Sequence, residues 1–263
     1  MPKRVNDIFI PAITFRKLLE AHNKTKKGKR FKKQVIEFEM DMESNIIQIE
    51  KELLNGTYKF SKYFEFKIYE PKERIIKTLK YRDRVVQTWY VENFLKPYFA
   101  VSFISDSFAC IEDKGTHKAA NQMQKYLRKA DKEYEETWVL KCDISKFFFN
   151  IDCEILYKII ERKIKDREFL EFTKKILYTE NETGISNPIG NYTSKFYTKI
   201  YMNKFDKYIK EKLKIKYVER YMDDFVLLLK SKEEAKNILE KITVFLDEKL
   251  HLKLNQKTTY FKA

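Results

Sequence analysis

Several features are scarce in this chain of 263 residues, and each scarcity excludes a class of protein. Only five glycines and five prolines are present, which is too few for long linkers or low-complexity segments. Cys110, Cys142 and Cys153 are widely spaced, no CxxC pair occurs and the three histidines are scattered, so neither a disulfide framework nor a zinc site is expected. No apolar run reaches membrane-spanning length, and the first residues lack the apolar core of a secretory signal. A cytoplasmic protein with no membrane partner is therefore expected.

Positive charge and aromatic residues are abundant instead. The chain has 54 Lys and Arg against 39 Asp and Glu, a formal net charge of +15, together with 21 Phe and 17 Tyr. A basic, aromatic-rich chain favours a polyanionic partner, nucleic acid first. A lysine-rich proteome is the alternative explanation, because most of the basic residues are Lys. The apolar fraction of 43% is sufficient for a core, and the length suits one large domain or two lobes.

The order of elements predicts an α+β fold. Apolar residues at helical spacing predict helices in the first third, over 82–97, 115–134, 153–165, 167–178 and 231–250. Alternating residues on both sides of Pro71 predict two strands, a short apolar strand ends at Cys142, and two strands flank Asp223 and Asp224 as a hairpin. Separated strands among helices indicate an antiparallel sheet covered on one face by helices.

Three aspartates stand where these strands end. Asp143 follows the strand "WVLKC", and Asp223 with Asp224 lies in the turn of the apolar hairpin "ERYMDDFVLLLK". An aspartate pair alone is usually just a turn, but apolar strands on both sides and a third acid favour a site. Clustered carboxylates repel one another and are tolerated mainly beside a cation. Oxygen ligands without His or Cys favour Mg²⁺, and two such ions can assist phosphoryl transfer.

Five ordered blocks resemble the reverse transcriptases of bacterial retroelements, those of group II introns and diversity-generating retroelements. The blocks are "RDRVVQ", "SDSFACIEDKGTHKA", "KCDISKFFFNID", "NPIGNYTSKFYTKIYMNKFD" and "YMDDFVLL", within about residues 70–258. The resemblance implies a right-hand fingers–palm fold whose antiparallel palm sheet is backed by helices. It places fingers at 1–134, with a β-hairpin near 58–80, and the palm at 135–263. The thumb of the family is expected to be absent, so an accessory protein or a missing carboxyl-terminal thumb is an expected partner.

The resemblance also implies the metal ligands. Asp143 would hold both ions with help from the backbone carbonyl of Ile144. Asp223 matches the main ligand of the hairpin, and Asp224 its weaker companion. The implied cofactor is a pair of Mg²⁺ ions, for which Mn²⁺ can substitute.

Further residues match positions that contact the nucleotide in the family: Lys72, Arg74, Phe148, Gly190, Tyr221 and Met222. The basic members of this set would grip the triphosphate, a role for which Lys67 is an alternative. Phe148 matches the steric gate that excludes a 2′-hydroxyl group, whereas core packing is the alternative for one or more of Phe147–Phe149. Lys257 is the candidate general acid for the pyrophosphate leaving group, with Lys253 close to it in sequence.

The implied function is that of an RNA-directed DNA polymerase, a nucleotidyltransferase that adds dNTPs to a primer. Its partners would be an RNA template, a DNA or RNA primer and dNTPs. Two alternatives remain open: an RNA-binding splicing cofactor or scaffold, and a template-independent defence polymerase of the same fold.

Overall fold

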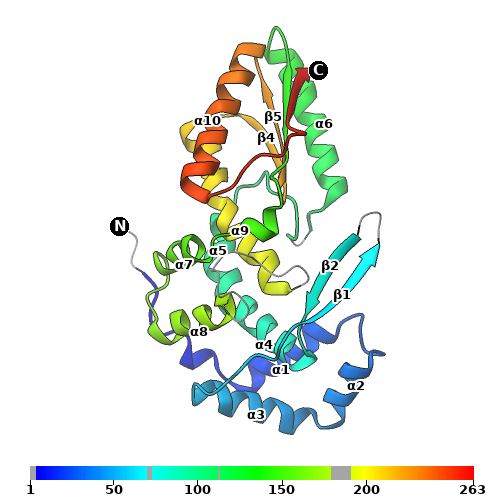
Figure 1. Ribbon diagram of the computed structural model, residues 1–263, viewed down its shortest axis with the longest axis vertical. Helices are drawn as coiled ribbons and strands as arrows, with labels where there is room; N and C mark the ends of the chain where they lie inside the picture. Colours follow the sequence, from blue (N-terminus) through cyan, green and yellow to red (C-terminus); the bar gives the residue numbers. More distant parts are fainter. Residues whose placement is uncertain (1–3, 70–72, 112, 179–190) are drawn as a thin grey trace. The chain divides into compact units, whose positions relative to one another are not determined.

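The computed structural model describes residues 4–69, 73–111, 113–178 and 191–263, which fall into two compact units. Unit 1 comprises Met1–Val101 and Cys153–Tyr197, and unit 2 comprises Ser102–Asp152 and Thr198–Ala263 (Figure 1). The chain therefore passes from one unit to the other at three points. The predicted division of the chain into fingers at 1–134 and a palm at 135–263 stays a prediction. Among the described residues, no helix is long and apolar enough to cross a membrane.

Unit 1 is mainly helical. Its elements are η1 (Ile10–Ala12), α1 (Phe15–Lys26), α2 (Lys33–Met40), α3 (Met42–Leu54), β1 (Phe64–Tyr69), β2 (Glu73–Thr78), α4 (Tyr81–Tyr90), the π-helix η2 (Val91–Leu95), α5 (Lys96–Phe99), α7 (Cys153–Glu161) and α8 (Arg167–Tyr178). Strands β1 and β2 pair antiparallel, with Phe64 opposite Thr78, as the alternation on both sides of Pro71 predicted.

The helical stretch that begins with α4 was predicted to end near Pro97, and it runs to Phe99. The π-turn of η2 separates α4 from α5, and Pro97 lies in the first turn of α5. A first-turn position needs no intrahelical N–H donor, so proline is tolerated there.

The core of unit 1 is a cluster of aromatic side chains. Trp89 is fully buried, and its ring lies 5.6 Å from Phe9, 5.2 Å from Phe94 and 6.0 Å from Phe172, measured between ring centroids. Its indole Nε1–H donates to the Ala12 carbonyl oxygen at 2.8 Å, so the polar atom of the ring is satisfied. The amino-terminal segment is thereby fixed to helices α4 and α8.

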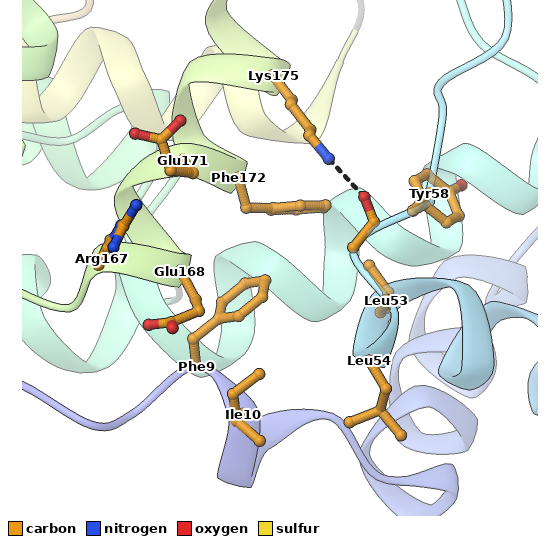
Figure 2. A pocket seen from close by; sticks show the side chains of 11 residues that line it. Phe9, Ile10, Leu53, Leu54, Tyr58, Arg167, Glu168, Glu171, Phe172 and Lys175 are labelled. Carbon is orange, nitrogen blue, oxygen red and sulfur yellow. Dashed lines mark hydrogen bonds between the residues drawn. The ribbon is translucent and has the colours of Figure 1, made fainter.

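A cavity of about 190 Å³ opens beside this cluster. Phe9 and Phe172 line it, and charged side chains of α8 stand at its edge (Figure 2). Lys175 Nζ donates to the Gly56 carbonyl oxygen at 2.8 Å across one side. The lining combines charges of both signs with apolar side chains, so its composition does not favour an anion.

Unit 2 contains the main sheet. Its elements are α6 (Thr116–Glu133), β3 (Trp138–Cys142), η4 (Phe147–Asn150), the π-helix η5 (Tyr208–Lys212), β4 (Tyr217–Tyr221), β5 (Asp224–Leu229), α10 (Lys232–Leu250) and β6 (Thr259–Lys262). Two elements cross a unit boundary, η3 (Ala100–Ser102) and α9 (Tyr192–Lys207). The sheet has the order β4-β5-β3-β6 with every pair antiparallel. Strand β6 was not predicted from the sequence.

Helices cover both faces of this sheet, where the element order alone indicated one. On one face, Ala130 of α6 joins Val139, Tyr217 and Leu228 in a buried cluster. On the other face α10 packs against β3, β5 and β6, and Phe205 of α9 lies 4.9 Å from Phe225 between ring centroids. Figure 1 shows the strands between α6 and α10.

Glu219 of β4 gives unit 2 a pH-dependent stability. Burial, and then the nearby Asp106 carboxylate, raises the pKa of Glu219 to about 7. In the unfolded chain the pKa of a glutamate is about 4.3. The folded chain therefore holds this proton more tightly, and the free energy of unfolding falls as the pH rises from about 4 to 7. Glu219→Gln is therefore expected to raise the melting temperature at pH 8 and to give little gain at pH 4, in thermal unfolding. Glu211→Gln, at an exposed residue, is the matched control, and a gain from Glu219→Gln that is equal at both pH values would contradict the assignment.

Candidate active site

The β4–β5 hairpin turns through two residues. Tyr221 pairs with Asp224 across the strands, so Met222 and Asp223 alone form the turn. Both aspartates were predicted to lie in the turn, but Asp224 is the first residue of β5. Met222 has φ +61°, a left-handed conformation that glycine usually supplies in two-residue hairpins. A non-glycine residue there costs about 1–2 kcal/mol, and such strain clusters at functional sites.

Strand β3 brings the third aspartate beside this hairpin. It pairs antiparallel with β5, and Cys142 lies opposite Phe225 at the end of the ladder. One step further along each strand come Asp143 and Asp224. The three predicted acids, Asp143, Asp223 and Asp224, are thus neighbours at one end of the unit 2 sheet.

Burial and mutual repulsion act on these carboxylates. Burial raises the pKa of Asp223, and the charges of Asp224 and Asp143 add to this effect, whereas a hydrogen bond from the Asp223 backbone and the charge of Arg220 oppose it. Burial, and then the charge of Asp143, raises the pKa of Asp224, which Lys141 opposes. The charged forms are therefore unfavourable as they stand, and a bound cation would relieve them.

The donor set suits a hard cation. Its atoms are carboxylate oxygens, which are the ligands that Mg²⁺ prefers. Within the described part of the chain, no group of three or more His, Cys, Asp or Glu side chains is arranged so that it could hold a metal ion. The three aspartates thus fit a divalent cation by chemistry and by strand register, while their side chains are not gathered around one point.

Asn255, which was not predicted from the sequence, holds Asp143 through two contacts. Its backbone N–H donates to the Asp143 carbonyl oxygen at 2.7 Å, and its side-chain Nδ2 donates to Asp143 Oδ2 at 2.9 Å. The second contact engages one of the two carboxylate oxygens of Asp143. Lys257 lies in the same turn, where its backbone N–H donates to Asn255 Oδ1 at 3.1 Å and its side chain is exposed.

The segment after Asp143 separates three phenylalanines by burial. Ile144 is buried and forms an isolated bridge with Leu254. Phe147 is buried, which confirms core packing for this residue, whereas Phe149 is 51% exposed. Phe148 is half-buried, and its ring meets that of Phe147 edge-on at 5.6 Å. Among the three phenylalanines, Phe148 is thus intermediate in exposure.

Three predicted nucleotide contacts cannot be placed. Lys72 and Gly190 lie outside the described residues, and so does the side chain of Arg74, whose backbone belongs to β2 opposite Ile68. The alternative, Lys67, forms an exposed ion pair with Glu73 at 2.6 Å. The role of these residues stays a prediction.

A second candidate region is a cavity of about 250 Å³ in unit 1, here called the basic pocket. Its lining residues are Lys24, Thr25, Lys27, Lys29, Arg84, Gln87, Thr88, Asn191, Tyr192 and Lys195. Five of the ten are cationic and none is acidic. Partial burial lowers the pKa of Lys29, and repulsion by Arg84, Lys32 and Lys195 adds to it. A negatively charged ligand would offset this repulsion.

The floor of the basic pocket holds unpaired acceptors. Gln87 Oε1 and Asn191 Oδ1 are buried and have no hydrogen-bond partner among the described residues. Buried acceptors of this kind call for a donor from a ligand or water. Phosphate oxygens suit the cations, and sugar hydroxyl or base amino groups suit the acceptors.

Comparison with known proteins decides the family. Residues 67–262 match the model of the family described as reverse transcriptase (RNA-dependent DNA polymerase). The chain belongs to the reverse transcriptase family. The family to which the five sequence blocks pointed is confirmed.

Two curated relatives of this chain are distant and longer. Protein YkfC of Escherichia coli is 24% identical over 220 residues, which cover 68% of this chain and 56% of the relative. A putative COX1/OXI3 intron 2 protein of Saccharomyces cerevisiae is 23% identical over 188 residues, covering 48% of this chain and 22% of the relative. The chain thus spans about half of the first relative and less of the second.

Solved structures confirm the fold of this chain. Apo telomerase from Candida tropicalis, truncated from its C-terminal domain, superposes with a TM-score of 0.57 at 14% identity, over 78% of this chain and 50% of that one. Telomerase from the same organism in complex with a TWJ fragment of telomeric RNA gives a TM-score of 0.52 at 12% identity, over 84% and 45% of the two chains. The predicted α+β fingers–palm fold, with an antiparallel sheet backed by helices, is confirmed.

Proposed function

We propose that this chain catalyses RNA-directed DNA synthesis, adding dNTPs to a DNA or RNA primer along an RNA template. The observation that carries the proposal is the strand register that brings Asp143, Asp223 and Asp224 to one end of the unit 2 sheet. Nucleotide addition places negative charge on the transferred phosphoryl group, and catalysis of that step is mainly positioning and charge stabilisation.

Reverse transcriptases are generally Mg²⁺-dependent, and the residues of this site fit that ion. Asp143 and Asp223 would be the main ligands, with Asp224 and the carbonyl oxygen of Ile144 in support, for two Mg²⁺ or Mn²⁺ ions. Bound ions supply charge stabilisation to an in-line phosphoryl displacement. Asn255 would keep Asp143 in a fixed orientation through its two hydrogen bonds.

The remaining predicted residues would act on the nucleotide. Phe148, half-buried beside Phe147, would lie beneath the sugar and exclude a 2′-hydroxyl group. Tyr221, 37% exposed at the end of β4, and Met222 in the turn would pack near the primer end. Lys257, exposed in the turn that Asn255 begins, would protonate the leaving group. Lys72, Arg74 and Gly190 would bind the triphosphate and the base.

The basic pocket would hold a phosphate and sugar unit of the RNA. Its volume of about 250 Å³ is below the roughly 300–1,000 Å³ of pockets for whole small ligands, so it suits one unit of a strand. One structural neighbour is telomerase in complex with a fragment of telomeric RNA, which supports RNA as the partner class here.

The double variant Lys27→Gln/Lys29→Gln should weaken RNA binding and its dependence on salt. Two lost phosphate contacts reduce the slope of log affinity against log salt by about 1.4 for a single strand. Titrations of labelled single-stranded RNA at several salt concentrations measure this slope. Lys51→Gln/Lys59→Gln removes the same charge from exposed residues that do not line the pocket. Equal slopes in the two double variants would show that net charge alone governs binding.

Primer extension tests the proposed function directly. The purified chain, an RNA template annealed to a DNA primer, Mg²⁺ and the four dNTPs should yield DNA complementary to the template. Omission of one dNTP should stop synthesis at the first position that requires it. Incorporation that ignores the template would favour the template-independent defence polymerase. Tight RNA binding without any incorporation would favour the splicing cofactor or scaffold, for which the basic pocket is the supporting observation.

A further inference from the structure

Arg220 is a buried charge next to the catalytic hairpin. It is 3% exposed in β4, between Glu219 and Tyr221. Its Nε and Nη2 groups donate to the two carboxylate oxygens of Asp206 in α9, each at 2.6 Å, and Asp206 is 2% exposed. Burying such a pair costs several kcal/mol per ion, and apolar residues of similar volume often stabilise a fold as well or better. Stability alone is therefore a poor reason for this pair.

The third contact of the guanidinium group reaches the turn itself. Arg220 Nη1 donates to the Met222 carbonyl oxygen at 2.7 Å, and Nη2 also reaches Ser107 Oγ at 3.3 Å. The Met222 carbonyl belongs to the peptide bond that leads into Asp223. This peptide follows a residue with φ +61°, so the guanidinium group fixes the turn where its backbone is strained.

The backbone of Arg220 is held as firmly as its side chain. Its N–H donates to the Asp106 carbonyl oxygen at 2.9 Å, and its own carbonyl oxygen accepts from the Phe108 N–H at 3.0 Å. On its other edge Arg220 lies opposite Phe225 of β5. The guanidinium group thus projects from a strand fixed on both edges, oriented by Asp206, toward one carbonyl oxygen of the turn.

We propose that Arg220 and Asp206 are positioning residues that hold the Met222–Asp223 peptide, and through it the Asp223 carboxylate, in place beside Asp143 and Asp224. This inference rests on the proposed function of that site. The pair contacts neither substrate nor metal, and it acts through the backbone of the turn. Arginine is required because its planar fork grips Asp206 with two N–H groups and still presents a third to Met222, which the point charge of lysine cannot do.

The double variant Arg220→Met/Asp206→Leu separates positioning from stability. It removes the buried charges while keeping apolar volume, so the melting temperature should stay close to that of wild type or rise. Without the contact to Met222, kcat for single-nucleotide incorporation should fall about 10- to 100-fold, the usual effect of losing a residue that orients a metal ligand. The KM for dNTP should change less than about threefold, because no nucleotide contact is lost.

A second readout does not depend on catalysis. Mn²⁺ affinity, measured by electron paramagnetic resonance without nucleic acid or dNTP, should fall about 10- to 100-fold in the same variant. Arg220→Lys, which keeps the charge opposite Asp206, should show both losses, so a double variant that fails to fold leaves the inference testable. Lys216→Met/Glu133→Leu removes an exposed ion pair of unit 2 and should leave both quantities within about twofold.

Wild-type kcat and Mn²⁺ affinity in either folded Arg220 variant would overturn the inference and assign the pair to the fold alone. A wild-type chain that incorporates no nucleotide would instead overturn the proposed function. The Mn²⁺ measurement would then still decide whether Arg220 positions the carboxylates.

Discussion

Asp223→Asn is expected to abolish nucleotide incorporation while leaving the chain as stable as wild type or more stable. The variant would lose the proposed main metal ligand of the hairpin, and loss of several kcal/mol of transition-state stabilisation lowers the rate by on the order of 10³-fold or more. Stability changes in the opposite direction because burial and repulsion by Asp224 and Asp143 oppose the Asp223 charge, as its raised pKa records.

Single-nucleotide incorporation and thermal unfolding of the same preparation measure the two effects. Asp143→Asn should match Asp223→Asn in rate, and Asp224→Asn should lose less. Asp131→Asn, at an exposed residue of α6, is the matched control and should change neither quantity. A rate within tenfold of wild type in Asp223→Asn, or a marked loss of stability, would contradict the role given to this residue.

Trp89→Ala is expected to destabilise unit 1 by about 3–5 kcal/mol, the usual cost of truncating a buried aromatic side chain. The substitution removes ring contacts with Phe9, Phe94 and Phe172 and the hydrogen bond to Ala12. Chemical denaturation of the whole chain gives the free energy of unfolding.

Trp89→Phe is the control for the ring, because it keeps an aromatic side chain and loses the N–H donor. Its expected cost is about 1–2 kcal/mol, from the lost hydrogen bond and the reduced volume. Equal losses in the two variants would show that the hydrogen bond to Ala12, and not aromatic packing, holds this core together.

The site could be predicted where its residues follow from chain pattern. Asp143 ends an apolar strand and Asp223 interrupts a hairpin, and both features are local. Their meeting then required only that β3 and β5 be neighbours, which the register of Cys142 and Phe225 shows. The position of Asp224 inside β5 was missed because its pairing with Tyr221 depends on the turn having two residues.

The supporting residues could not be predicted, because they act over long separations and through backbone atoms. Asn255 is 112 positions from Asp143, and nothing in "LKLNQK" shows that its amide and backbone N–H meet one aspartate. Arg220 reads as an ordinary charge in a strand until its contacts with Asp206 and the Met222 carbonyl are seen. The available signal was a pair of charged residues, Glu219 and Arg220, in a strand whose other residues are tyrosine and valine.

The division into units was equally invisible in the sequence. The chain leaves unit 1 at Val101 and returns to it at Cys153, and no glycine-rich or proline-rich linker accompanies either passage. Helix α9 continues through the third passage without a break. Composition marks boundaries only where a flexible linker is needed, and here η3 and α9 carry the chain across the first and third passages.

A crystal structure grown with Mn²⁺, a primer annealed to an RNA template and a dNTP would decide whether the three aspartates hold the catalytic metals. We expect anomalous scattering peaks from Mn²⁺ in contact with Asp143 and Asp223, and their loss in Asp143→Asn. Mn²⁺ bound elsewhere in a chain that still extends the primer, with these carboxylates unliganded, would contradict the assignment.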